Sequence, residues 1–123
     1  MFDKFKAMGQ MAALLKDKER LKESAQRIKA RASEVRVSGE SGAGAVRVVA
    51  DGTMKVLSVE FQPALVMGMA ADEKTRALAG TLIAEAVNEA IKNAQGAMKT
   101  VVEREAKEMG FPDLPGELGN FLS

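Results

Sequence analysis

The sequence predicts an α+β fold in which a three-stranded antiparallel sheet lies between two long helices. Both ends of the 123-residue chain carry apolar residues at helical spacing, whereas the middle carries short runs in which apolar and polar residues alternate. Turn-forming segments rich in Gly separate these runs. One domain is expected at this length, so residues 1–123 are interpreted as a single α-β-β-β-α unit.

The first helix is predicted over residues 3–34. Its apolar residues recur at helical spacings that approach a heptad repeat, and they are Met11, Leu14, Leu21, Ala25, Ile28 and Ala32. At about 1.5 Å per residue, a helix of about thirty residues spans roughly 45 Å.

Residues 35–61 are predicted to form a three-stranded meander. The first strand ends near Ser38, and Gly39–Gly44 is interpreted as the turn that follows it. Asp51-Gly52 predicts a type I′ hairpin turn between the second and third strands, because both central positions of that turn need a positive φ. The third strand, residues 55–61, should place its apolar residues Leu57, Val59 and Phe61 on one face.

The second long helix is predicted over residues 72–109, with Asp72 as its N-cap. Its apolar face is rich in Ala, Ile and Val. Residues 110–123 are rich in Pro and Gly and are predicted to form a flexible tail.

The lengths of the two helices favour a homodimer. A compact domain of this size has a radius of gyration of roughly 14 Å, and a small sheet does not cover two helices of 45 Å or more. The distal halves of the helices must therefore pack on each other, pack on a second copy, or project as arms. We expect a second copy of the chain to share the core.

The composition argues against an enzyme. The chain has no Cys, His, Tyr or Trp, so cysteine nucleophiles and the commonest general base and metal ligand are missing and only Ser, Thr, Asp, Glu, Lys and Arg remain for chemistry. Neither a cofactor nor a metal site nor a small-molecule substrate is expected. Gly39–Gly44 lacks the Gly-Lys-Ser/Thr ending of a phosphate-binding loop, so it is interpreted as a turn. Acidic pairs such as Glu103/Glu105 are interpreted as solvated faces. No membrane-spanning run or signal peptide is recognised, which predicts a cytoplasmic protein without a membrane partner.

The positive charge is concentrated in the first helix. Residues 1–36 carry ten Lys and Arg against five Asp and Glu, whereas residues 71–123 carry six against nine. At about 100° per residue the cations form two rows. The first row, Lys16, Arg20, Arg27 and Arg31, is expected opposite the apolar stripe, and the second row, Lys18, Lys22 and Lys29, flanks that stripe. Such rows suit contact with DNA phosphates, but the interleaved acidic residues are equally consistent with a solvated or protein-binding face.

Several segments together resemble the YbaB/EbfC family of bacterial nucleoid-associated proteins. They are Met1-Phe2, the run Val35–Val48, Asp51-Gly52, the run Val59–Pro63, Glu85–Ala90 and Leu114–Gly116. The resemblance implies a tweezer-like homodimer that binds double-stranded DNA, helps to organise the nucleoid and in some members regulates genes. It implies no catalytic residues.

The resemblance attributes DNA binding to the helical arms. We map it onto the two cationic rows of the first helix and onto Lys92, Lys99, Arg104 and Lys107 of the second. One segment, Val66–Ala71, is more apolar than the family pattern, which indicates an altered loop or a dimer contact. The alternative function is a protein-interaction adaptor that uses the helices as coiled-coil docking surfaces without binding DNA.

Overall fold

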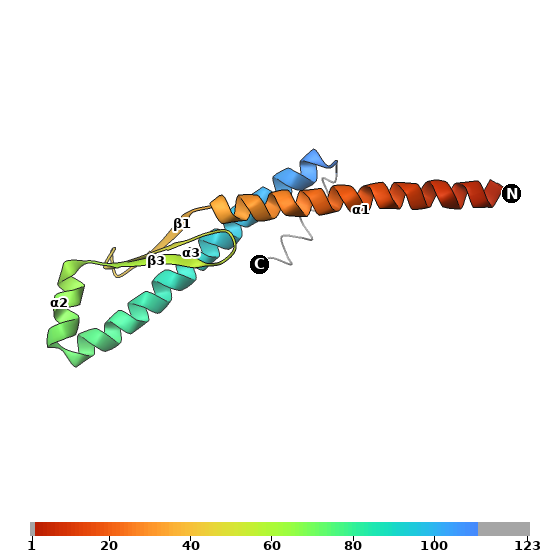
Figure 1. Ribbon diagram of the computed structural model, residues 1–123. Helices are drawn as coiled ribbons and strands as arrows, with labels where there is room; N and C mark the ends of the chain where they lie inside the picture. The colour runs from red at the N-terminus through yellow and green to blue at the C-terminus, as the bar shows by residue number, and fades with distance from the viewer. Residues whose placement is uncertain (1, 111–123) are drawn as a thin grey trace.

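The computed structural model describes the backbone of residues 2–110 and the side chains of residues 17–110, and it confirms the predicted α-β-β-β-α order with one added helix. The elements are α1 (Phe2–Glu34), β1 (Val37–Ser41), β2 (Val46–Ala50), β3 (Val56–Phe61), α2 (Pro63–Ala71) and α3 (Glu73–Glu108). The sheet lies against α3, and α1 leaves one end of the sheet and projects far beyond it (Figure 1). The predicted tail lies mostly outside the described residues.

The sheet is antiparallel with the strand order β1-β2-β3. In its register Gly39 of β1 is opposite Val48 of β2, and Val48 is opposite Val59 of β3. The face toward α3 carries Val46 and Val48, which are fully buried. The opposite face carries polar residues such as Arg47 and Glu60, as expected for a sheet with one solvated side.

α3 covers β1 and β2 through a stripe of small residues. Its buried positions recur mostly every four residues and include Ala79, Ala86, Ala90, Ala94, Met98, Val102 and Ala106. Because Ala side chains are short, the backbone of β1 approaches the helix closely. A Cβ atom at Gly39 would overlap the backbone of Ala86 and Ala90. This contact explains why Gly39 lies within a strand rather than in the predicted turn. The turn itself is Gly42–Gly44, where all three residues have positive φ.

The N-cap prediction for α3 is confirmed, because the Asp72 side chain accepts a hydrogen bond from the Lys74 amide at 3.0 Å. The type I′ prediction at Asp51-Gly52 is wrong. A longer loop joins β2 to β3, in which the Asp51 carboxylate accepts hydrogen bonds from the amides of Thr53 and Lys55. The hydrogen bond from the Thr53 hydroxyl leads a set of interactions that hold the pKa of Asp51 below its ordinary value.

α2 corrects the interpretation of Val66–Ala71 as a loop. Pro63 occupies the first turn of this nine-residue helix, where its missing amide proton is tolerated. None of the residues of α2 is charged or fully buried. The helix is apolar all round, so it has no amphipathic periodicity by which it could be recognised.

Candidate nucleic-acid interface

The C-terminal end of α1 is fixed to the loop between β2 and β3. The Gly52 amide donates a hydrogen bond of 2.8 Å to the carbonyl of Ala32, and Ala32 is buried. A Cβ at Gly52 would lie 2.8 Å from the carbonyl oxygen and 2.9 Å from the Cα of Ala32, and also close to the sulfur of Met98, so glycine is needed for this contact between α1, the loop and α3. From this fixed point the helix runs outward as an arm (Figure 1).

Farther along the arm, a buried carboxylate on α3 binds three side chains of α1. Glu105 is 1% exposed, and its Oε1 atom accepts hydrogen bonds from Arg27 Nε at 2.6 Å and from Ser24 Oγ at 3.1 Å. Arg31 Nη1 lies 3.7 Å from Oε2, which has no hydrogen-bond partner among the described atoms. We call these four residues the Glu105 cluster.

The ionised form of Glu105 is favoured despite its burial. Burial opposes the charge, but the hydrogen bonds from Arg27 and Ser24 and the positive charges of Arg27 and Arg31 outweigh it. The pKa of this carboxyl therefore lies below its ordinary value of 4.5. The expectation that Glu103 and Glu105 both belong to a solvated face is wrong for Glu105.

The Glu105 cluster also corrects the predicted orientation of α1. The row that contains Arg20, Arg27 and Arg31 was expected to face away from the packing side, yet it lies on the side toward α3. Arg20 Nη2 approaches the carbonyl of Met109 at 3.4 Å, beside the C-terminal end of α3. α1 turns this side toward α3 because the buried contact between the two helices is polar and is formed by Ser24 and Glu105. The spacing of apolar residues does not reveal such a contact. The side chain of Lys16 lies outside the described residues.

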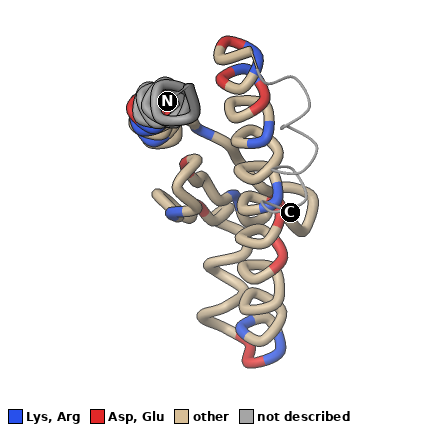
Figure 2. The backbone as a smooth tube through the Cα atoms, turned by 90° about the vertical axis from the view of Figure 1, so that its right-hand side faces the viewer, with Lys and Arg blue, Asp and Glu red and all other residues tan. Residues whose placement is uncertain are grey.

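The second row, Lys18, Lys22 and Lys29, is exposed along the arm. These three lysines fall within a sector of about 40° on the helix, and no acidic residue of the described part of α1 falls in that sector. No ion pair to them is found among the described side chains. Figure 2 looks nearly along α1 and shows Lys and Arg along it and near both ends of α3. The row spans roughly 16 Å of helix rise at about 1.5 Å per residue.

The cations of α3, unlike the lysine row of α1, have acidic residues beside them. Lys92, Lys99, Arg104 and Lys107 are all exposed. At about 100° per residue Lys92 and Lys99 share a sector of the helix with Glu85 and Glu103. The alternation of charges weakens the positive potential of this face relative to the row on α1.

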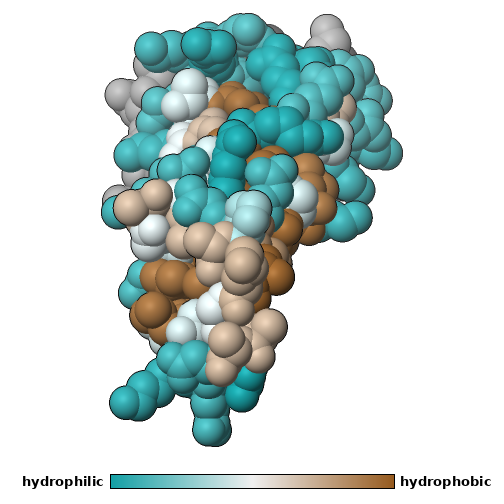
Figure 3. All heavy atoms as spheres, turned by 90° about the vertical axis from the view of Figure 1, so that its left-hand side faces the viewer, coloured by the Kyte–Doolittle hydropathy of each residue, from teal (hydrophilic) through white to brown (hydrophobic). Residues whose placement is uncertain are grey.

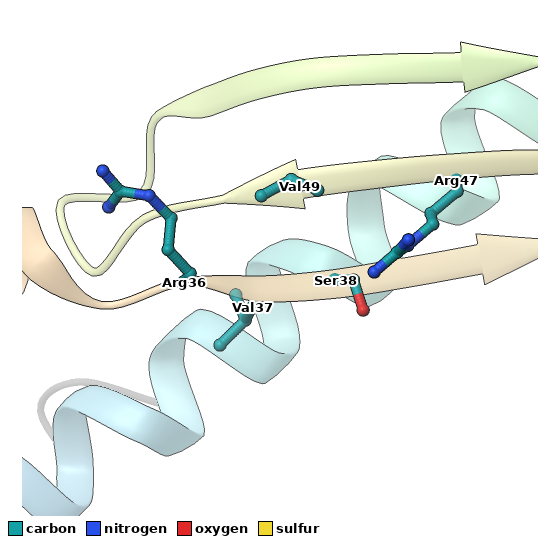
Figure 4. Close-up of a pocket in the computed structure, with 5 residues that line it drawn as sticks. All are labelled: Arg36, Val37, Ser38, Arg47 and Val49. Atoms are coloured by element: carbon teal, nitrogen blue, oxygen red, sulfur yellow. The ribbon is translucent and has the colours of Figure 1, made fainter.

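Two further arginines, Arg36 and Arg47, line a shallow hollow on the sheet. Arg36, Val37, Ser38, Arg47 and Val49 line it (Figure 4). Arg36 Nη1 donates to the carbonyls of Ser33 and Val35 at 2.8 and 2.9 Å, and Arg47 lies 3.9 Å from Glu40. The two guanidinium groups point in different directions (Figure 4), so the hollow is not a built anion site.

A large apolar surface lies at the other end of the molecule from the arm. The predicted face of β3 is present at Val59 and Phe61, which are paired with Val48 and Val46, whereas a register irregularity places Val56 rather than the predicted Leu57 opposite Ala50. α3 covers this face only in part. Val56, Leu57, Val59 and Phe61 are 37% to 41% exposed, and Met67 of α2 is 73% exposed. Val66 of α2 is also exposed. Figure 3 shows apolar side chains gathered over this end of the molecule. We call it the β3–α2 surface.

Among the described side chains, no three metal-ligating residues gather into a site. The hydroxyl of Ser41 donates to the carbonyl of Leu82 and thus serves the packing of β1 on α3. In the described part of the chain, no helix has the length and apolar character needed to cross a membrane. The molecule is a small α+β unit with a basic helical arm and an exposed apolar surface, two kinds of surface that mark binding sites in proteins.

The comparisons with known proteins identify the kind of binding. Residues 8–109 match the model of the YbaB/EbfC DNA-binding family, and the chain belongs to this family. It is 28% identical over 106 residues to a nucleoid-associated protein of Pelotomaculum thermopropionicum, an alignment that covers 86% of this chain and 96% of the relative. The resemblance stated from the sequence is thereby confirmed, and the family is one of DNA-binding rather than catalytic proteins.

A solved structure supports the fold. The crystal structure of an uncharacterized protein from Helicobacter pylori superimposes with a TM-score of 0.51 at 16% identity, and the match covers 67% of this chain and 89% of that chain. At this identity the likeness concerns the architecture alone.

Proposed function

We propose that this nucleoid-associated DNA-binding protein binds double-stranded DNA as a homodimer and that the lysine row of α1, Lys18, Lys22 and Lys29, supplies the main phosphate contacts. The observation that carries the proposal is the exposed lysine row on a projecting arm. Phosphate contact requires an extended set of cations within reach and little side-chain geometry beyond that. Lys92 and Lys99 are proposed as weaker, supporting contacts because acidic residues share their sector.

The mechanism is the release of counterions from DNA as lysines approach its phosphates. Such binding is expected to depend strongly on salt and weakly on sequence. Arg20, Arg27 and Arg31 contribute less, because their side chains are engaged at α3. The described part of the chain has no Tyr or Trp, and this favours duplex DNA over single strands, which are bound by base stacking. A protein that binds many sites on duplex DNA in this way can help to organise the nucleoid. It can also regulate a gene where a bound site overlaps a promoter.

Fluorescence anisotropy across a salt series tests the proposal directly. Labelled duplexes of two unrelated sequences and a single strand of equal length are titrated with the protein. The expected result is similar affinity for both duplexes, weaker binding to the single strand, and a linear fall of log affinity with log salt. Absence of duplex binding at low salt, or affinity that does not change with salt, would contradict the proposal.

The homodimer is supported by the β3–α2 surface. Apolar side chains of β3 and α2 form it, and α2 carries no charge that would select a partner of opposite charge. An apolar, uncharged surface is complementary to itself, as an interface across a two-fold axis requires. Monomeric proteins seldom leave such a patch open to water. The second copy is therefore the proposed occupant.

Two substitutions on one strand separate this interface from general damage to the fold. Val59→Glu places a charge on the β3–α2 surface, whereas Ser58→Glu places the same charge on the opposite, solvated face of β3. Analytical ultracentrifugation is expected to give a dimer for the wild type and for Ser58→Glu, and a monomer for Val59→Glu. A Val59→Glu protein that remains dimeric would place the interface elsewhere. A monomeric wild type would reject the homodimer and favour a different protein as the occupant.

A further inference from the structure

The direction of the α1 arm is set at two places. The first is the end of the helix, where Ala32 is buried and its carbonyl accepts the hydrogen bond from Gly52. The second is the Glu105 cluster, which engages α1 between Ser24 and Arg31. One fixed point allows a rod to pivot, whereas two points some distance apart define its direction. Ser24 lies about 12 Å from Ala32 along the helix, at about 1.5 Å per residue.

Apolar packing beyond the first point is confined to the part of the arm near Ile28, which is half-buried. Leu21 is 54% exposed, although it belongs to the apolar stripe of α1. Outside the Glu105 cluster, the remaining hydrogen bond from the described side chains of the arm to α3 is the long one from Arg20 to the Met109 carbonyl. Farther out than Ile28, the described contacts of the arm to α3 are polar, and Glu105 is at their centre.

The chemistry of the cluster suits a positioning role. A carboxylate that is almost fully buried needs partners, because an uncompensated buried charge is strongly unfavourable. Arg27 and Ser24 supply hydrogen bonds whose geometry depends on the angle between α1 and α3, so rotation of the arm would leave Glu105 unpaired. Arg27 and Arg31 remain 49% and 42% exposed, which shows that they reach inward from the edge of the arm.

We propose that Glu105 is a positioning residue that fixes the direction of the α1 arm relative to α3 and thereby aligns the lysine row that contacts DNA. The second half of this inference rests on the proposed function, whereas the first half concerns the protein alone. Glu105 contacts no DNA in this scheme and acts through Arg27, Arg31 and Ser24.

Because the arm is long, a small change in its direction produces a measurable displacement of its outer part. Asp17 lies about 22 Å from Ala32 along α1, at about 1.5 Å per residue. A pivot of about 10° at Ala32 therefore moves Asp17 by about 4 Å, and it moves the start of the helix at Phe2 by about 8 Å. Loss of the Glu105 cluster should broaden the distribution of distances between the arm and α3 by several ångströms.

The test measures that distribution by double electron–electron resonance. The chain contains no cysteine, so Asp17→Cys on the arm and Asn88→Cys on α3, both at exposed positions, can be spin-labelled specifically. Labelled protein is diluted with excess unlabelled protein so that distances within one chain dominate. Glu105→Gln is compared with Glu108→Gln, an exposed glutamate one turn away whose replacement changes the net charge equally.

The expected result is a narrow distribution for the wild type and for Glu108→Gln, and a broader or shifted one for Glu105→Gln. Arg27→Lys and Arg27→Gln test the same contact from the arm. Lysine keeps a cation near Glu105 and should retain the narrow distribution, whereas glutamine should broaden it. Far-UV circular dichroism identifies variants that fail to fold. If Glu105→Gln does not fold, the test depends on the two Arg27 variants, which replace a half-exposed residue. A folded Glu105→Gln or Arg27→Gln protein with the wild-type distribution would overturn the proposal.

DNA affinity supplies the functional measurement. Glu105→Gln should weaken duplex binding relative to Glu108→Gln by a few-fold, because a loose arm must be ordered on binding. If the wild type binds no DNA, the proposed function fails while the distance measurement still decides whether Glu105 positions the arm. If the distances broaden and affinity matches that of Glu108→Gln, the alignment of the lysine row by Glu105 is refuted.

Discussion

Replacing the three lysines of the row on α1 by glutamine distinguishes the arm from α3 as the DNA-contacting element. Log affinity for duplex DNA falls with log salt with a slope of about 0.9 per phosphate contacted, so three contacts contribute about 2.7 to the slope. Between about 50 and 200 mM salt, a fourfold change, the wild type should lose about 40-fold more affinity than the triple variant for each arm that contacts the duplex.

The assay is fluorescence anisotropy on one duplex at four or more salt concentrations. The matched control is the triple variant Lys92→Gln, Lys99→Gln and Lys107→Gln on α3, which changes the net charge by the same amount. The α1 variant should flatten the salt dependence far more than the α3 variant. Equal slopes for the two variants would show that total charge matters rather than the arm, and an unchanged slope for the α1 variant would refute the assignment of its lysines.

The remaining predictions concern stability, measured by urea denaturation. Gly39→Ala should destabilise the protein by about 3 kcal/mol, the upper end for overpacking, because the new Cβ meets helix backbone; a loss below about 1 kcal/mol would argue against the close contact. Asp72→Ala should cost about 1 kcal/mol through loss of the N-cap of α3, and an unchanged midpoint would show that the cap contributes nothing. Because the pKa of Glu105 is lowered by folding, its contribution to stability is complete above pH 4.5 and is lost as the pH falls toward the pKa of the folded protein. The free energy of unfolding of Glu105→Gln should therefore fall less steeply in this acid range than that of the wild type. An identical fall in both proteins would refute the contribution of Glu105.

The long helices and the meander were predictable because each has a strong local signal. α1 and α3 begin and end within two residues of the predicted limits, and Asp72 caps α3 as its position before the apolar run indicated. The loop after β2 was not predicted. Asp51-Gly52 is typical of a two-residue turn, but Gly52 is required by its contact with α1, and positive φ occurs at Met54 instead.

The proposed DNA-contacting surface was predictable only in part, because it depends on contacts between residues far apart in the sequence. Periodicity identified both cationic rows, but it assigned the arginines to the wrong side of α1, because their partner Glu105 is about 80 residues away and resembles its exposed neighbours. α2 was missed for the opposite reason. A uniformly apolar segment of nine residues has no period, and only the fold shows that it forms a helix, which packs against the start of α3 and leaves Val66 and Met67 exposed.

The small residues that bring α3 close to the sheet have an energetic consequence. Among the described side chains, the fully buried apolar positions are valines and alanines, so this part of a single protomer removes little hydrocarbon from water for its length. Larger apolar side chains, such as Phe61 and Met67, remain partly open on the β3–α2 surface. If a second copy covers them, much of the hydrophobic stabilisation arises between chains, and folding and association become a single equilibrium governed by protein concentration. The cellular abundance of such a protein would then set the fraction that is folded as well as the fraction bound to DNA.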